Sequence, residues 1–154
     1  MKISMRGLFL LLPGLCVLAP FLFAEVVTEV GTDGTLTLQG GKRVALVGVQ
    51  MDTEGISVLR VLTQKQDVKL QMIATPTPGA RGLAYVYLKA KYLKFPAKLN
   101  EIPDEQEVLI NEFLVKVGAA KVVEAQDFSR KDRFLKVQEE ARKKGEGIWS
   151  YEAS

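Results

Sequence analysis

The stretch NEFLVKVGAAKV, residues 111–122, combines a helix signal with a strong stop signal. Asn111 is a good residue to cap the start of a helix, and Gly118 is placed to end it. Three apolar residues between them recur at helical spacing, namely Phe113, Leu114 and Val117. The stretch therefore predicts a short amphipathic helix that packs on a core.

Upstream of this helix, the sequence predicts two more strands and a further helix. The stretch LAYVYL, residues 83–88, has the aromatic and β-branched character of a strand. It follows Thr-Pro-Thr-Pro-Gly at 75–79, which breaks the chain. Before this breaker, residues 67–72 alternate apolar and polar side chains as a half-buried strand does, and residues 57–63 have helical spacing.

The N-terminal part of the domain predicts three strands joined by tight turns. The expected strands cover residues 25–30 (EVVTEV), 35–39 (TLTLQ) and 43–49 (RVALVGV). Gly-Thr-Asp-Gly at 31–34 and Gly-Gly at 40–41 supply the turns. This pattern is typical of a β-meander.

The C-terminal part predicts a last helix that starts near Asp127 or Ser129 and runs through Ala141. Its basic end at 142–144 suits a helix C-terminus, and Gly145 stops it. The prediction is thus five short strands, one helix between the third and fourth strands, and two helices at the end. We expect an α+β fold: a five-stranded Greek-key β-barrel with about three packed helices.

The first residues have the layout of a secretory signal. Lys2 and Arg6 precede an apolar run over residues 7–24, and Ala24 is the small residue after which we expect cleavage. The protein is accordingly expected to be secreted or periplasmic.

An uncleaved membrane anchor is the alternative for this segment, because the apolar run is just long enough to span a bilayer. Pro13 and Pro20 argue against it, as does the lack of a basic flank after the run. We therefore expect a signal peptide or an anchor over 1–24 and one domain over 25–154, with no membrane contact of the mature domain if the signal is cleaved.

Cysteine and histidine are missing from the expected domain. The chain has no histidine, and its one cysteine, Cys16, lies in the apolar run. This excludes disulfides, a structural zinc site and any Ser-His-Asp triad in the domain. Catalysis would have to use carboxylates, Lys, Arg, Tyr or a hard cation held by oxygen ligands. Loss of Lys2 and Arg6 would lower the formal charge from +3 to +1, so a polyanion ligand is permitted but not indicated.

The order of these elements, with three motifs, resembles the thermonuclease family, whose fold is the OB-fold. The motifs are RGLAYVY at 81–87, N-E-x-L-V-x-x-G-x-A-K-V at 111–122 and IWS at 148–150. The resemblance covers nearly all of residues 26–150. It concerns the framework, in which we expect Trp149 to pack the barrel against the last helix.

The resemblance also implies a chemistry that this chain lacks in part. Family members that cut nucleic acid hold calcium with two Asp and a Thr carbonyl, use a Glu for the attacking water, and grip the phosphate with two Arg. Where the family has Asp-Gly-Asp-Thr, this chain has Thr-Asp-Gly-Thr, so the metal Asp falls on Gly34 and Asp33 is its neighbour. Four further family positions are replaced, at Ala45, Gln50, Met51 and Thr53. Among the matched family residues, the second Arg survives, as Arg81.

A displaced site is a second possibility, because Asp52-Thr53-Glu54 resembles the family's Asp-Thr-Pro-Glu with the Pro deleted. Arg43 lies on the strand face that the lost Arg would share. Such a site would use Asp33 and Asp52 for calcium, Glu54 for the water, and Arg43 and Arg81 for the phosphate. The simpler alternative is that Asp52 and Glu54 cap the following helix.

Two binding features remain open. Arg81 could grip a phosphate or another anion, or it could tie its loop to the barrel through backbone carbonyls. The polar insertion at 89–107 mixes cations with aromatic side chains, a mixture that could hold a nucleic-acid strand, although a solvated loop is the ordinary interpretation. The candidates there are Lys89, Lys91, Tyr92, Lys94, Phe95 and Lys98.

The function expected from the sequence is therefore a non-catalytic, thermonuclease-like binding module. Its ligand would be nucleic acid or a protein partner, and it would need no cofactor. The alternative is a calcium-dependent nuclease with the displaced site.

Overall fold

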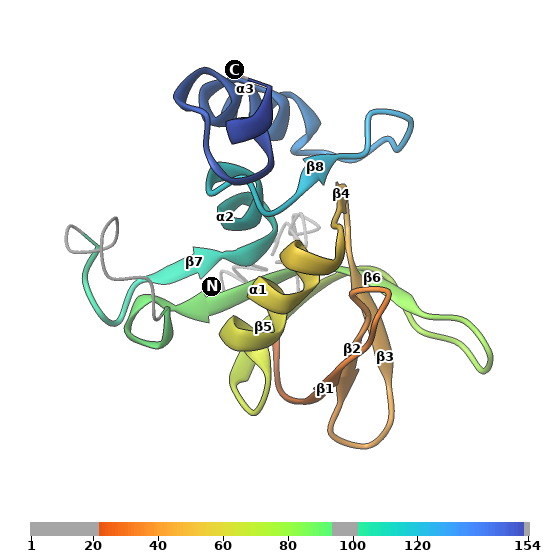
Figure 1. The fold of residues 1–154 in the computed structure, drawn as a ribbon. Coiled ribbons are helices and arrows are strands. Elements are labelled where there is room, and N and C mark those ends of the chain that lie inside the picture. The colour runs from red at the N-terminus through yellow and green to blue at the C-terminus, as the bar shows by residue number, and fades with distance from the viewer. Residues whose placement is uncertain (1–21, 94–101, 153–154) are drawn as a thin grey trace, which may run out of the picture.

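The computed structural model describes residues 22–93 and 102–152, and a closed five-stranded β-barrel forms its centre (Figure 1). The strand order is β3-β2-β1-β5-β6, and parallel pairing of β3 with β6 closes the barrel. The barrel strands are β1 (Leu22–Val30), β2 (Leu36–Leu38), β3 (Arg43–Leu46), β5 (Asp67–Ala74) and β6 (Gly82–Lys89).

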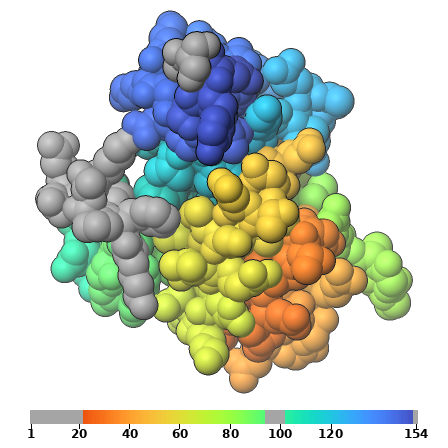
Figure 2. Space-filling model, viewed as in Figure 1, coloured from red at the N-terminus to blue at the C-terminus, as the bar shows by residue number. Residues whose placement is uncertain are grey.

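Three α-helices accompany the barrel, so the predicted α+β fold is confirmed. Helix α1 lies against β1, whereas α2 packs on β6 and against α3 (Figures 1 and 2). Two short strands, β4 and β8, pair with each other, and β7 adds to the free edge of β6. The bounds are α1 (Thr53–Thr63), α2 (Ile110–Lys116), α3 (Lys131–Lys144), β4 (Val49–Gln50), β7 (Glu107–Leu109), β8 (Lys121–Val122) and the 3₁₀ turns η1 (Ala90–Tyr92) and η2 (Gly147–Tyr151).

One core joins the barrel to the helices. Inward residues of the strands, such as Leu36, Leu70 and Val86, are at most 1% exposed, and they share a cluster with Leu114 of α2 and Phe134 of α3. The alternation of buried and exposed residues along β5 matches the predicted half-buried strand. The apolar pattern of the sequence therefore places both helices on the barrel.

The predicted strand over 43–49 is divided in the structure. Gly48 has a φ of +77°, which ends the extended chain after β3, and β4 then turns away to pair with β8. A Cβ at this position would lie 2.5 Å from the ring of Phe128, so the close approach of the C-terminal part also needs glycine. The single-strand prediction was wrong because the break depends on a partner far along the chain.

Asn111 is not the N-cap that the sequence predicts. Helix α2 begins one residue earlier, and Asn111 is fully buried inside its first turn. Its side chain accepts a hydrogen bond from the Val86 N–H at 2.9 Å and donates to the carbonyls of Val47 and Ala84 at 3.0 and 3.1 Å. The residue joins the helix to β6 and to the turn after β3. The predicted stop at Gly118, with a φ of +70°, is confirmed.

Two sequence expectations fall partly outside the described residues. These are the signal segment, as far as position 21, and the middle of the 89–107 insertion, residues 94–101, which includes Lys94. The strand β1 begins at Leu22, and the division of the chain after Ala24 stays a prediction. Within the described ranges, no helix has the length and apolar character that a membrane span requires.

Candidate functional site

The tight turn between β1 and β2 holds Asp33 in a fixed position. The Gly31 N–H donates to the Thr35 carbonyl at 2.8 Å, which closes the turn. One oxygen of Asp33, Oδ1, accepts the Thr35 N–H at 3.0 Å, and the other, Oδ2, accepts the Thr35 hydroxyl at 2.8 Å. Both carboxylate oxygens are therefore engaged within the turn itself.

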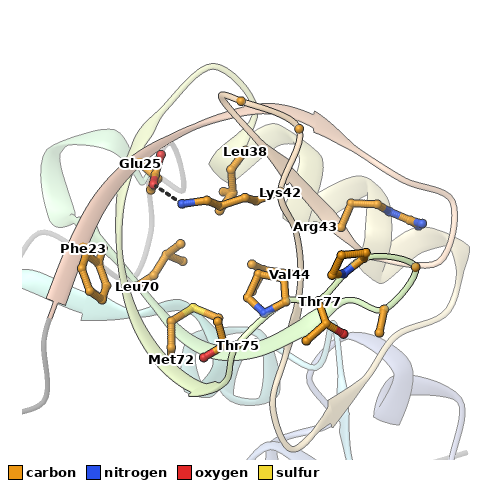
Figure 3. Close-up of a pocket in the computed structure, with 16 residues that line it drawn as sticks. Phe23, Glu25, Leu38, Lys42, Arg43, Val44, Leu70, Met72, Thr75 and Thr77 are labelled. Atoms are coloured by element: carbon orange, nitrogen blue, oxygen red, sulfur yellow. Dashed lines mark ion pairs between the residues drawn. The ribbon is translucent and has the colours of Figure 1, made fainter.

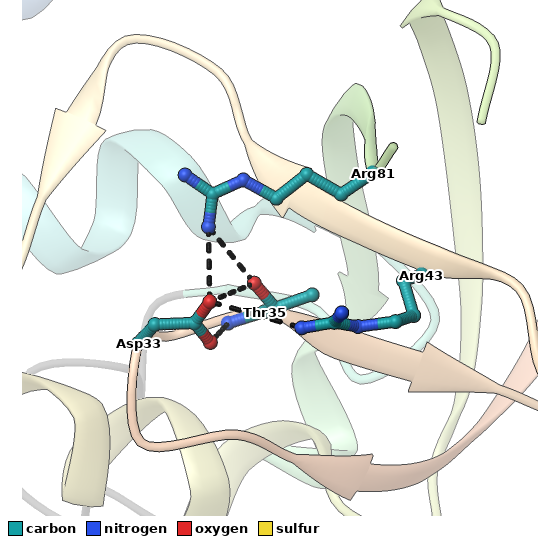
Figure 4. A network of polar contacts seen from close by, with 4 residues as sticks. All are labelled: Asp33, Thr35, Arg43 and Arg81. Atoms are coloured by element: carbon teal, nitrogen blue, oxygen red, sulfur yellow. Dashed lines mark hydrogen bonds and ion pairs between the residues drawn. The ribbon is translucent and has the colours of Figure 1, made fainter. Parts of the chain in front are cut away.

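Two arginines from adjacent strands approach this carboxylate (Figure 4). Arg81 Nη1 donates to Asp33 Oδ2 at 3.1 Å and to Thr35 Oγ1 at 3.0 Å. Arg43 Nη2 lies 3.9 Å from the same carboxylate oxygen. The parallel register, in which Val44 is opposite Gly82, explains the meeting because each arginine directly precedes one of these paired residues. We call Asp33, Thr35, Arg43 and Arg81 the arginine cluster.

The arginine cluster is exposed and carries one net positive charge. The side chains of Arg43, Arg81 and Asp33 are 61%, 48% and 50% exposed. The pKa of Asp33 lies below its ordinary value, first because of the hydrogen bonds from the Thr35 backbone and hydroxyl and then because of the charge of Arg81. Asp33 is thus a firmly ionised internal counter-ion for the two guanidinium groups.

The other two acidic candidates are used elsewhere. Asp52 is the N-cap of α1, and its Oδ1 accepts the Gly55 N–H at 2.8 Å. Glu54 lies in the first turn of the same helix and lines a small cavity of about 140 Å³ together with Val117 and Ile148. The helix-capping role that the sequence allowed for Asp52 is what the structure has.

The donor set does not fit the calcium ion that the family chemistry would require. Calcium takes six to eight oxygen ligands, mostly from carboxylates and carbonyls. Gly34 brings no carboxylate; a Cβ there would lie 2.9 Å from the Met51 side chain. The oxygens of Asp33 already accept from Thr35 and face a guanidinium, which repels a cation. Among the described residues, no group of three or more acidic, His or Cys side chains is placed to hold a metal ion.

The basic residues of the insertion are paired with acids of the same region. Lys89 and Lys91 each hold an oxygen of Glu105 at 2.6 Å. Tyr92 is 37% exposed, and the Lys91 ammonium lies 5.3 Å from the centre of its ring. Lys94, the remaining binding candidate, lies outside the described residues. Because Asp104, Glu105 and Glu107 outnumber Lys89 and Lys91, the described part of the insertion offers a polyanion no net positive charge.

The sequence analysis did not predict two residues that make side-chain contacts at the barrel, Thr35 and Arg130. Thr35 is 1% exposed and bridges Asp33 to Arg81, although the matching Thr of the Asp-Gly-Asp-Thr motif could have indicated it. Arg130 stacks on Tyr85 at 4.8 Å and donates to the Tyr87 hydroxyl at 2.8 Å. No local pattern indicates the Arg130 contacts, because its partners lie about forty residues earlier.

The closed barrel, its three helices and the two arginines at the β3–β6 edge define an OB-fold domain with a nuclease-like framework. Residues 78–151 match the family model described as staphylococcal nuclease homologue. This match over the C-terminal part of the chain agrees with the resemblance to the thermonucleases. No curated protein matches the chain significantly.

Proposed function

We propose that this chain is an exported, non-catalytic member of the staphylococcal nuclease family that binds single-stranded nucleic acid. The observation that carries the proposal is the arginine cluster, in which two exposed guanidinium groups remain beside a carboxylate that is held by Thr35. Guanidinium groups recognise phosphate well, because their planar N–H donors match its oxygens. The position that would supply the metal carboxylate is Gly34, and Asp52 caps α1. The chain thus keeps two arginines that can bind phosphate, but it lacks the residues that would bind calcium and activate water.

The first test asks whether the domain cuts nucleic acid. Purified protein is incubated with single-stranded DNA and calcium, with and without a chelator. We expect no chelator-sensitive cleavage, because the described carboxylates do not converge on a cation site. Chelator-sensitive cutting that Glu54→Gln abolishes, but that the exposed control Glu139→Gln leaves intact, would establish the calcium-dependent nuclease instead.

The second test measures single-stranded DNA affinity as a function of salt concentration. Arg81→Met is expected to weaken binding and to reduce the slope of log K against log salt by about 0.7, the value for one phosphate contact on a single strand. Asp33→Asn is expected to tighten binding, since it removes the internal counter-ion from both arginines. Lys144→Met, at the exposed end of α3, is the matched charge control.

The same titration separates nucleic acid from a protein ligand. Affinity that does not depend on salt, or that Arg81→Met leaves unchanged, would contradict phosphate binding by the arginine cluster. A protein partner would then be the better interpretation of the preserved framework.

A further inference from the structure

A groove of about 280 Å³ lies beside the barrel, where the end of β6 meets α2 and the start of α3. Tyr87 of β6 forms part of its wall. The charged residues of its lining are Glu107, Glu112, Lys116, Arg130 and Arg133. We call this hollow the α3 groove. It brings together charged side chains from three parts of the chain that are far apart in the sequence.

Arg130 is a half-buried cation whose plane is fixed by two tyrosines. Its guanidinium carbon lies 4.8 Å from the centre of the Tyr85 ring and 5.9 Å from that of Tyr87. One of its five N–H donors binds the Tyr87 hydroxyl at 2.8 Å, and the other four make no hydrogen bond with a described residue. The group is therefore pre-organised, with donors left for an anion.

Both acids that line the α3 groove already have a cationic partner. The pairs are Glu112 with Arg133 and Glu107 with Lys69 of β5. Arg130 and the exposed Lys116, by contrast, form no ion pair with any acid of the described ranges. The groove thus presents two positive charges that its own acids do not neutralise.

The α3 groove lies on the same face of β6 as Arg81. Side chains alternate along a strand, so Arg81, which directly precedes β6, and Tyr87 point to the outer face, whereas Val86 packs in the core. From Gly82 to Tyr87 the strand advances by about 17 Å, at roughly 3.3 Å per residue. The arginine cluster and the α3 groove are therefore two cationic places along one strand.

The larger hollow at one end of the barrel, of about 620 Å³, does not offer such charge (Figure 3). Its Lys42 Nζ lies 3.7 Å from Glu25 Oε1, so this pair is neutral. Its Arg43 points away from the hollow and belongs to the arginine cluster with Asp33 (Figures 3 and 4). Of the two hollows, the α3 groove is the one whose charge suits a polyanion.

We propose that the α3 groove is a second contact site for the single strand that the arginine cluster binds, with Arg130 and Lys116 each holding a phosphate. At about 3.4 Å per nucleotide of stacked strand, the separation along β6 corresponds to about five nucleotides. This length lies within the roughly 4–16 nucleotides that one OB-fold covers. The inference rests on the proposed function, because it concerns the same strand.

The test compares the salt dependence of affinity for a long and a short oligonucleotide, (dT)8 and (dT)2. Lys116→Met is expected to reduce the slope of log K against log salt for (dT)8 by about 0.7, and Arg130→Met by the same amount. Neither variant should change the binding of (dT)2, which is too short to reach both sites. Arg81→Met should weaken both oligonucleotides, and Lys144→Met, at the exposed end of α3, is the charge control.

The variants also separate a failure of this site from a failure of the proposed function. If Arg81→Met weakens (dT)8 while Lys116→Met and Arg130→Met leave its slope unchanged, the second site is overturned and the arginine cluster stands. If none of the three changes the slope, both proposals fail. Arg130→Met removes a contact with Tyr87, so circular dichroism checks its folding. Lys116 makes no such contact with the described residues, so Lys116→Met decides the matter if Arg130→Met is unfolded.

Discussion

At the scale of the residue, Asn111 shows how one buried amide can hold two layers together. Its three hydrogen bonds reach β6 and the turn after β3, which are distant in sequence, and the whole side chain is removed from water. The Ala84 carbonyl also accepts the Val47 N–H at 3.0 Å, so it keeps a partner if Asn111 is lost. The Val86 N–H and the Val47 carbonyl are the groups that depend on this amide.

Asn111→Leu is therefore expected to destabilise the protein by about 3 kcal/mol, because it leaves two buried polar groups without a partner at roughly 1–3 kcal/mol each. Urea unfolding of both proteins measures the difference. The exposed control Gln39→Ala should shift the free energy of unfolding by less than about 0.5 kcal/mol. A loss as small as that for Asn111→Leu would mean that water replaces the amide.

The sequence could predict individual residues of the candidate site but not their partners. Arg43 and Arg81 were expected near one another from the strand face and the family motif, and the parallel register brings them to the same carboxylate. The choice of Asp33 as that partner depends on a turn 48 residues before Arg81, which no local pattern encodes. Asn111 has the same explanation: its local context indicates a cap, and its long-range partners decide otherwise.

At the scale of the element, Lys89 at the end of β6 and Lys91 just after it form ion pairs with Glu105, which precedes β7. Hydrogen bonds from Lys89 and Lys91 lower the pKa of Glu105 to about 2 from its ordinary value of 4.5. Because the folded pKa is the lower one, the stabilisation is present above about pH 4.5 and is lost as the pH falls towards 2. These ion pairs contribute nothing in strong acid, where the carboxyl group is protonated in both states.

Replacing both lysines, as Lys89→Met with Lys91→Met, is expected to return the Glu105 pKa towards 4.5. An NMR titration of the carboxyl carbon measures this value directly. The stability difference between the two proteins should be constant above pH 4.5 and vanish near pH 2. An unchanged Glu105 midpoint in the double variant, with Lys144→Met as the control, would contradict the ion pairs.

Element boundaries were predicted where the signal is local and missed where it is not. Gly118 and Gly145 end their helices as expected, since a left-handed residue is a local requirement. Helix α1 starts four residues before the 57 expected from apolar spacing, at the Asp52 cap that the sequence had offered as one role of this residue. The division of the third strand at Gly48 depends on Phe128 and could not be predicted from its own neighbours.

At the scale of the whole molecule, close backbone approaches join the barrel side to the C-terminal side. Gly55 of α1 is so near the segment after α2 that a Cβ would lie 2.0 Å from the Ala119 carbonyl oxygen. A Cβ at Gly118 would lie 2.1 Å from the Glu146 carbonyl oxygen. Glycine is required at both places because backbone, and not a mobile side chain, occupies the space.

Gly55→Ala is expected to destabilise the protein by about 2 kcal/mol, since overpacking against backbone outweighs the higher helix propensity of alanine. Thermal unfolding followed by circular dichroism measures the change. Ser57→Ala, an exposed change in the same helix, should have an effect below about 0.5 kcal/mol. A Gly55→Ala protein as stable as the parent would show that α1 can move away from Ala119 freely.

The position of Trp149 gives the chain a built-in optical probe. It is the one tryptophan in the sequence, it is 2% exposed, and its ring lies between the Arg142 guanidinium at 4.5 Å and the Lys121 ammonium at 4.9 Å. Its indole emission therefore reports on the docking of η2 against α3 and β8. The tyrosines of β6, by contrast, absorb from within the barrel wall. Comparing the two chromophores during unfolding would reveal whether the C-terminal layer detaches before the barrel opens.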